Sequence, residues 1–347
     1  MIINKTDKKT LRSYFDSLDK KIKENNTLVE TVYVDLGVKM VRILNYSEEF
    51  TLLMNRQLNW SLRKEADHFD TTLVVWKNEV SDEELRWVFD KEYSDKLPVV
   101  MIEGATGKVD GYDREKETYY FGYGLLCPED FVTEGHMFVR TFYNILKTPS
   151  SHLVHGACLG LEGNGILFCA RGQRGKSTLT VLSLLEGFEY VSDDYLVLEQ
   201  VDKKLKAYPV YSIITLSPIM YNRMFDKLEG TRFVSNNWNK SKYVINIANL
   251  HDRFRTAYPI KVCMFPEIVS DPEPSIVKCN PVEKGRAITH LVHSTVTQML
   301  NLQDNDSVKK LMGMLNNYDF YKINLCSDIY KNVECLREFT KSIKLED

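Results

Sequence analysis

The stretch ILFCARGQRGKST, from Ile166 to Thr178, decides how this chain is interpreted. Its apolar start, Ile166–Cys169, predicts a short strand, and a helix is expected from about 177 to 186, with Gly187 at the C-cap position. The segment between them follows the pattern G-x-x-x-x-G-K-[ST], with Ala170 at the first glycine position. A strand, this pattern and a helix in succession indicate a phosphate-binding loop, also called a P-loop or Walker A motif.

A loop that leads into a helix can hold phosphate groups through its backbone. Its N–H groups form an anion-binding nest, and the start of the helix adds partial positive charge. The Lys176 ammonium group can reach the β- and γ-phosphates, and the Ser177 hydroxyl is placed to coordinate Mg²⁺. The alternative is a glycine-containing surface turn that precedes a helix, because Ala170 lacks the backbone freedom of glycine. The candidate nucleotide-binding residues are Ala170, Arg171, Gly172, Gln173, Arg174, Gly175, Lys176, Ser177 and Thr178.

Two adjacent carboxylates follow at Asp193 and Asp194, directly after the strand-like Tyr190–Val191. In P-loop folds an acidic residue at such a strand end commonly holds Mg²⁺. Two carboxylates can take two roles: one can lie near the metal, and the other can accept a proton from an attacking hydroxyl group. The alternative is a polar turn, since Ser-Asp-Asp favours turns. The position after a P-loop favours the functional interpretation.

His155 is a further candidate, just upstream of the P-loop strand. A histidine on an apolar strand is more often a core residue than a ligand. The spacing of His152 and His155 does not by itself predict a metal site.

The order of elements predicts an α/β fold with two domains. Thr148–Ser151 breaks the chain, so we expect an N-terminal mixed α/β region over 1–150 and a P-loop domain over 151–347. In the second, Leu153–Leu161 is expected as one strand and Asn164–Gly165 as a two-residue turn. The first carries no chemical motif, and substrate recognition or assembly is a hypothesis for it. Its predicted elements are a helix over Leu11–Lys23, a hairpin around Gly37, a buried strand over Thr72–Trp76 and a hairpin of Lys108–Tyr112 with Thr118–Tyr123.

The bulk composition excludes several classes of function. The chain has 347 residues and a formal net charge of −3, which offers no general attraction to nucleic acid or to an anionic membrane. The N-terminus is charged rather than apolar, and no uncharged apolar run is long enough to span a bilayer. The seven cysteines form no C-x-x-C pattern, which favours reduced thiols in a cytoplasmic protein. A homo-oligomer is left open.

Three motifs taken together resemble one known family. They are His155–Gly156, the P-loop stretch from Ile166, and YVSDDYLVLE from Tyr190 to Glu199. This combination is similar to the HPr kinase and phosphoenolpyruvate carboxykinase superfamily. It looks closest to bacterial HPr-kinase-like proteins outside the HPr kinases proper, some of which are similar to kinases that phosphorylate a serine on a biosynthetic peptide, as in lasso-peptide clusters. The resemblance covers roughly Leu153–Glu199.

The resemblance implies a P-loop domain of HPr-kinase/carboxykinase type with a mixed sheet. It assigns Lys176 to the β- and γ-phosphates, Ser177 to Mg²⁺, and the two aspartates to a base and a metal ligand. We expect Asp193 as the base and Asp194 at Mg²⁺, and the opposite order is left open. His155 matches a family histidine near the γ-phosphate and the metal. The second, glycine-rich signature of HPr kinases and the substrate motifs of carboxykinases are absent, so neither HPr nor oxaloacetate is the expected substrate.

Three functions remain as hypotheses. The first is a Mg²⁺-dependent kinase that transfers the γ-phosphoryl group of ATP to a hydroxyl group, of a Ser or Thr in a peptide or protein, or of a small molecule. The second is a GTPase, because Asn4-Lys5-Thr6-Asp7 matches the guanine-reading string N-K-x-D, although too little chain precedes it to form the presenting strand. The third is a non-catalytic nucleotide-binding or scaffold protein, which the imperfect P-loop allows.

Overall fold

The chain forms two compact units, and each is described here by itself. The computed structural model describes residues 2–6, 8–78, 86–90, 100–103, 108–124, 136–170, 174–224, 232–237, 240–247, 252–300 and 305–343. The units are Met1–Ile145 and Leu146–Asp347. The domain boundary expected at residue 150, and the separate role expected for each domain, stay predictions. No helix within these ranges is long and apolar enough to cross a membrane.

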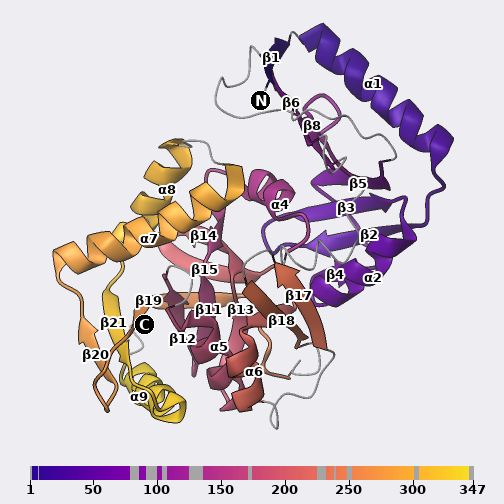
Figure 1. Ribbon diagram of the computed structural model, residues 1–347. Helices are drawn as coiled ribbons and strands as arrows, with labels where there is room; N and C mark the ends of the chain where they lie inside the picture. Colours follow the sequence, from indigo (N-terminus) through magenta and orange to yellow (C-terminus); the bar gives the residue numbers. More distant parts are fainter. Residues whose placement is uncertain are drawn as a thin grey trace. The chain divides into compact units, whose positions relative to one another are not determined.

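The N-terminal unit is built on one mixed sheet with helices packed against it (Figure 1). The three parallel strands at its centre are β3, β5 and β9, and α1 packs Phe15 and Ile22 against Val74, Trp76 and Tyr120. In sheet order the strands are β1 (Ile2–Thr6), β6 (Arg86–Asp90), β7 (Val100–Glu103), β8 (Lys108–Asp113), β9 (Thr118–Tyr123), β5 (Thr71–Lys77), β3 (Met40–Asn45), β2 (Glu30–Asp35) and β4 (Leu62–Arg63). The helices are α1 (Lys8–Asn25), α2 (Glu48–Gln57) and α4 (Val139–Leu146).

The C-terminal unit carries a second mixed sheet and a small antiparallel one. The larger follows the order β10 (Ser151–His155), β14 (Tyr195–Val201), β15 (Lys204–Pro209), β19 (Tyr258–Ile268), β12 (Asn164–Phe168), β11 (Ala157–Leu161) and β13 (Glu189–Ser192). Beside β19 lies β21 (Phe320–Leu325), which pairs with β20 (Ser275–Lys278). The small sheet is β16 (Ile213–Leu216), β18 (Lys240–Asn246) and β17 (Arg232–Asn237).

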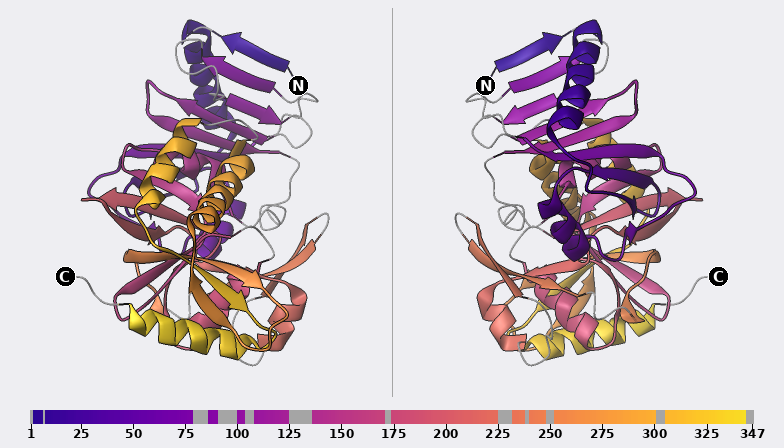
Figure 2. Two further views of the ribbon diagram at one scale, coloured as in Figure 1. Left: turned by 90° about the vertical axis from the view of Figure 1, so that its left-hand side faces the viewer. Right: turned by 90° about the vertical axis from the view of Figure 1, so that its right-hand side faces the viewer.

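Helices pack on both sides of the larger sheet. They are α5 (Lys176–Leu185), α7 (Pro281–Leu300), α8 (Asn305–Asn316) and α9 (Ile329–Ser342), whereas α6 (Pro218–Met224) contacts β18 of the small sheet. The core joins Leu291 of α7 and Leu311 of α8 to buried strand residues such as Leu167 and Leu196. Figure 2 shows α9, in yellow, on the other side of these strands, where it contacts α5 and β11. The chain is therefore α/β, as the order of elements predicts, with mixed sheets in both units.

Most predicted elements occur, but two expectations on either side of the P-loop strand are wrong. The expected strand Leu153–Leu161 is two strands, because the chain changes partner at Gly156. There β10 pairs with β14, whereas β11 pairs with β12 and β13. A Cβ atom at Gly156 would lie 3.0 Å from the Phe168 carbonyl oxygen, so the backbones approach closely at this break.

The predicted turn at Asn164–Gly165 is also wrong. Both residues belong to β12, and the hairpin turns at Glu162 and Gly163, with φ of 53° and 82°. Gly165 instead allows close packing, because a Cβ atom there would lie 2.1 Å from the Pro259 carbonyl oxygen. A glycine is required at position 165, but the reason is close packing against β19, a strand almost one hundred residues away in the sequence, and not a turn.

Candidate active site

The start of α5 is shaped by one glycine with a left-handed backbone. Gly175 is the N-cap residue of α5 and has φ of 86°, a value that favours glycine. A Cβ atom at this position would lie 2.7 Å from Leu325 Cδ1. Upstream, the Cys169 N–H group donates to the Met264 carbonyl oxygen at 2.8 Å, and Ala170 is buried. The predicted loop residues Arg171, Gly172 and Gln173 lie outside the described residues, while Arg174 is exposed.

The Lys176 side chain lies between the two predicted aspartates. Its Nζ atom donates to Asp193 Oδ1 and to Asp194 Oδ1, at 2.9 Å in each case. The side chains of Lys176 and Asp193 are 5% and 1% exposed, so this pair is almost fully withdrawn from water. The strand β13 ends at Ser192 and thereby delivers both carboxylates to the first turn of α5. The fold thus joins two motifs that the sequence separates by sixteen residues.

Asp194 is the most constrained residue of this cluster. It has φ of 65°, in the left-handed region that residues other than glycine adopt infrequently. Besides Lys176, its Oδ1 atom lies 3.5 Å from His155 Nε2, and its Oδ2 atom accepts a hydrogen bond from the Thr215 hydroxyl at 3.0 Å. Backbone strain of this kind persists only where the surroundings hold the residue in place, and it concentrates at functional sites.

His155 reaches the cluster from the end of β10. Its backbone pairs with Tyr195 across the β10–β14 ladder, and the two rings lie 5.1 Å apart. Its N–H group donates to the Thr295 hydroxyl at 2.9 Å, which ties β10 to α7. Its buried Nδ1 atom has no hydrogen-bond partner among the described residues. The structure therefore brings His155, Lys176, Asp193 and Asp194 together in one place.

Burial and the neighbouring charges shift the acidities of this cluster. Burial raises the pKa of Asp193, Lys176 opposes the rise and Asp194 adds to it, so that the pKa lies above the usual range of an aspartate. For Lys176, burial alone would lower the pKa, but the two carboxylates more than offset this and raise it. At neutral pH the lysine therefore stays charged, and Asp193 is a stronger base than an exposed aspartate.

The residues present fit a magnesium–nucleotide complex by the chemistry of their donors. Mg²⁺ prefers oxygen ligands and takes only one or two carboxylates when phosphate oxygens and water complete its shell. Asp194 and the Ser177 hydroxyl supply such oxygens, and Ser177 lies close enough to Asp193 to lower its pKa. The buried Asp193 Oδ2 atom lacks a hydrogen bond of standard geometry within the described part of the chain. No group of three or more His, Cys, Asp and Glu side chains there could hold a metal by itself.

Sequence reasoning missed the residues that support this cluster. Thr215 comes from β16, where it is the one hydroxyl in an apolar strand, and Thr295 comes from α7, where Ser294 and Thr297 are its neighbours and nothing marks it out. The side chains of the cationic residues Lys240 and Lys242 lie outside those that the structure describes. The string Asn4–Thr6 lies inside β1, which pairs in parallel with β6, and Asp7 lies outside the described residues.

Comparison with known proteins adds a distant likeness only. No family model and no curated protein matches the chain. Among solved structures, the Hpr(Ser) kinase/phosphatase from Coxiella burnetii is similar, with 13% sequence identity over 54% of this chain and 95% of that chain, at a TM-score of 0.31. Because this likeness is so distant, the function is inferred from the residues of the chain itself. These define an α/β protein with a lysine at the start of a helix, held by two aspartates from the end of a neighbouring strand.

Proposed function

We propose that the protein is a Mg²⁺-dependent kinase that transfers the γ-phosphoryl group of ATP to a hydroxyl group. The observation that carries this proposal is the Lys176 ammonium group, placed 2.9 Å from both Asp193 Oδ1 and Asp194 Oδ1 at the start of α5. Phosphoryl transfer requires a cation for the phosphates, an oxygen site for a metal and a base for the acceptor. One buried cluster of this unit offers all three.

Each residue has a task that follows from its surroundings. The left-handed Gly175 opens the start of α5, where backbone N–H groups and the helix dipole favour phosphate. Lys176 would turn from the carboxylates to the β- and γ-phosphates, whose negative charge would match its own. Asp194 and Ser177 would hold Mg²⁺, which when bound supplies positive charge to the phosphate oxygens.

Asp193 is assigned the role of base because it is the more deeply buried of the two carboxylates. Its side chain is 1% exposed against 13% for Asp194, and its pKa lies above the usual range. It would accept the proton of the acceptor hydroxyl, whereas Asp194 is held in place by Thr215 and faces His155. The acceptor is proposed to be a Ser or Thr of a peptide or protein, or a small molecule.

The test is transfer of label from γ-labelled ATP to candidate acceptors, including peptides from neighbouring reading frames, followed by mass spectrometry. Asp193→Asn should lower the transfer rate by about 10²- to 10⁴-fold, the usual contribution of general acid–base catalysis, and leave nucleotide binding intact. The matched control is Asp202→Asn, an exposed residue of the β14–β15 turn with φ of 49°, a conformation that Asn tolerates. It should leave the rate unchanged.

A dependence on pH provides a second test of the base. Because the pKa of Asp193 is raised, we expect the acidic limb of the rate profile to lie at a higher pH than an ordinary aspartate would give. The rate should fall as the pH is lowered through a value above the ~3.9 of an ordinary aspartate. The acidic limb should be missing from the residual activity of Asp193→Asn. An acidic limb shared by both proteins would assign the titration to another group.

A non-catalytic nucleotide-binding protein is the second candidate. It is favoured by the alanine at position 170 and by the full pairing of Lys176 with carboxylates. Tight ATP binding without label transfer to any acceptor would support it over the kinase. Comparing ATP with GTP in the same binding assay tests the GTPase alternative, for which a clear preference for GTP is required.

A further inference from the structure

The N-terminal unit contains a cavity that the proposed kinase chemistry does not use. Its volume is about 120 Å³, and it lies between α1 and the central parallel strands β3, β5 and β9. The helix contributes Asp19, Ile22 and Lys23 to its wall. A cavity of this size, close to the roughly 150 Å³ of an engineered site that holds benzene, accommodates a small organic group.

The floor of the cavity is divided into a polar row and an apolar row. Arg42, Thr72 and Thr118 lie side by side across the three strands and form the polar row. The next row on the same face consists of Leu44, Val74 and Tyr120. A ligand that fills both rows has a polar head and a short apolar body.

Arg42 is a cation of this cavity with unmet hydrogen-bonding capacity. One Nη atom donates to the Thr72 hydroxyl at 2.9 Å, and the guanidinium lies 4.1 Å from the centroid of the Phe69 ring. Its buried Nε atom has no hydrogen-bond partner, and no carboxylate of the described residues is paired with it. Leaving a buried donor unsatisfied costs free energy, and the guanidinium fork matches an oxyanion.

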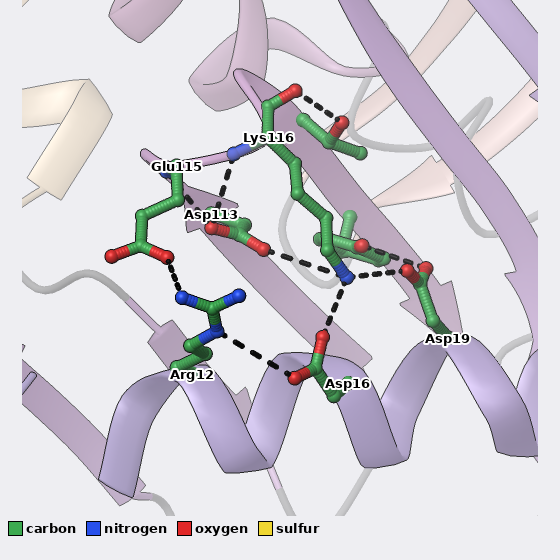
Figure 3. A network of polar contacts seen from close by, with 8 residues as sticks. Arg12, Asp16, Asp19, Asp113, Glu115 and Lys116 are labelled. Atoms are coloured by element: carbon green, nitrogen blue, oxygen red, sulfur yellow. Dashed lines mark hydrogen bonds and ion pairs between the residues drawn. The ribbon is translucent and has the colours of Figure 1, made fainter. Parts of the chain in front are cut away.

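Lys116, by contrast, is already neutralised. Its Nζ atom lies 2.9 Å from Asp16 Oδ1, 2.7 Å from Asp19 Oδ2 and 3.8 Å from Asp113 Oδ2, and Figure 3 shows it pointing into this acidic group. Asp19 also accepts a hydrogen bond from the Tyr120 hydroxyl at 2.7 Å. These three carboxylates outnumber the single charge of Lys116, so they would repel a dianion such as a phosphate monoester more strongly than a monoanion. None of them is paired with Arg42.

We propose that this cavity binds a monocarboxylate with a short apolar body. The carboxylate would accept hydrogen bonds from the guanidinium group of Arg42, and the carbon chain would lie over Leu44 and Val74. The carboxylate of such a ligand balances the charge of Arg42 in the polar row, and its carbon chain covers the apolar row. This site goes beyond the proposed phosphoryl transfer and does not depend on it.

The test is titration of the full chain with butyrate, followed by calorimetry and by thermal unfolding. Butyrate should bind saturably and raise the unfolding temperature, whereas butyramide, of the same shape without the charge, should bind roughly 10- to 100-fold more weakly. Inorganic phosphate at the same concentrations should not displace butyrate, because the phosphate site proposed at the start of α5 lies in the other unit. Arg42→Met should weaken butyrate binding by a similar factor. The control Lys20→Met removes one positive charge from the exposed face of α1 and should leave binding unchanged.

Several results would overturn the proposal. Equal binding of butyrate and butyramide, unchanged binding by Arg42→Met, or displacement of butyrate by inorganic phosphate would each do so. Should Arg42→Met fail to fold, Arg42→Lys keeps the charge but removes the fork and the Nε–H group, and must still weaken binding. The comparison of butyrate with butyramide on the unaltered chain needs no variant and decides the matter by itself.

Discussion

At the scale of single residues, Gly175 controls how α5 begins. Its φ of 86° is costly for any residue with a Cβ atom, and Leu325 fills the space that such an atom would need. Two other glycines separate these effects. Gly187 has φ of 103° with nothing within 4 Å of a Cβ atom, and Gly313 lies in α8 with nothing within 4 Å and an ordinary φ.

Replacing each of these glycines by alanine should therefore give three different results. Gly175→Ala should lower the free energy of unfolding most, by about 2 kcal/mol, from strain and overlap together. Gly187→Ala should lower it by about 1 kcal/mol from strain alone, and Gly313→Ala should raise it by about 0.5–1 kcal/mol through helix propensity. Urea denaturation measures all three. A Gly175→Ala variant as stable as Gly313→Ala would show that the start of α5 tolerates a side chain.

At the scale of elements, the β11–β12 hairpin holds the P-loop strand in register. Its turn has positive φ at both central residues, 53° at Glu162 and 82° at Gly163. Such a two-residue turn prefers Asn-Gly, because asparagine enters the left-handed region more readily than glutamate. The chain thus carries a less favourable residue at the first turn position.

Glu162→Asn should stabilise this hairpin by about 0.5–1 kcal/mol, since it removes part of the cost of a left-handed residue. Chemical denaturation gives the change, and Glu162→Gln is the matched control. It removes the same charge without gaining the backbone preference, and it should be close to neutral. A gain of equal size in both variants would attribute the effect to charge rather than to the turn.

The same hairpin shows what sequence patterns can and cannot predict. Alternation and apolar runs predict β12, α5, β13 and β14, because those signals are local. The break at Gly156 depends on a backbone contact with Phe168 in the next strand, and the role of Gly165 depends on one with Pro259, far along the chain. Neither contact is written in the residues next to the glycine.

The candidate site divides in the same way. Lys176, Asp193, Asp194 and His155 sit in or near short motifs, so a local pattern suffices to propose them. Thr215, which donates to Asp194, enters from β16 and leaves no local signature. Arg42 is likewise one cation on an alternating strand, and its unmet Nε–H group becomes visible only in the folded unit. Supporting residues of this kind depend on chain topology, which residue spacing does not encode.

At the scale of the whole molecule, the two proposed ligands belong to different compact units. The nucleotide is proposed to bind at the start of α5 in Leu146–Asp347, and the carboxylate beneath α1 in Met1–Ile145. A ligand that binds the native state stabilises it according to its concentration, by about 2.7 kcal/mol at one hundred times its Kd. Amide hydrogen exchange locates that stabilisation, because amides near a bound ligand open less often.

Exchange measured on the full chain should therefore show two separate footprints. Mg²⁺ with ATP should slow exchange at the start of α5 and at the end of β13, and butyrate should slow it in α1, β3 and β9. Arg42→Met should erase only the butyrate footprint. Lys176→Met should erase only the nucleotide footprint, since it removes the charge proposed to meet the phosphates. If the unaltered chain lacks one of the two footprints, that site is rejected and the other stands. A nucleotide footprint in α1 would contradict the assignment of the nucleotide to the start of α5.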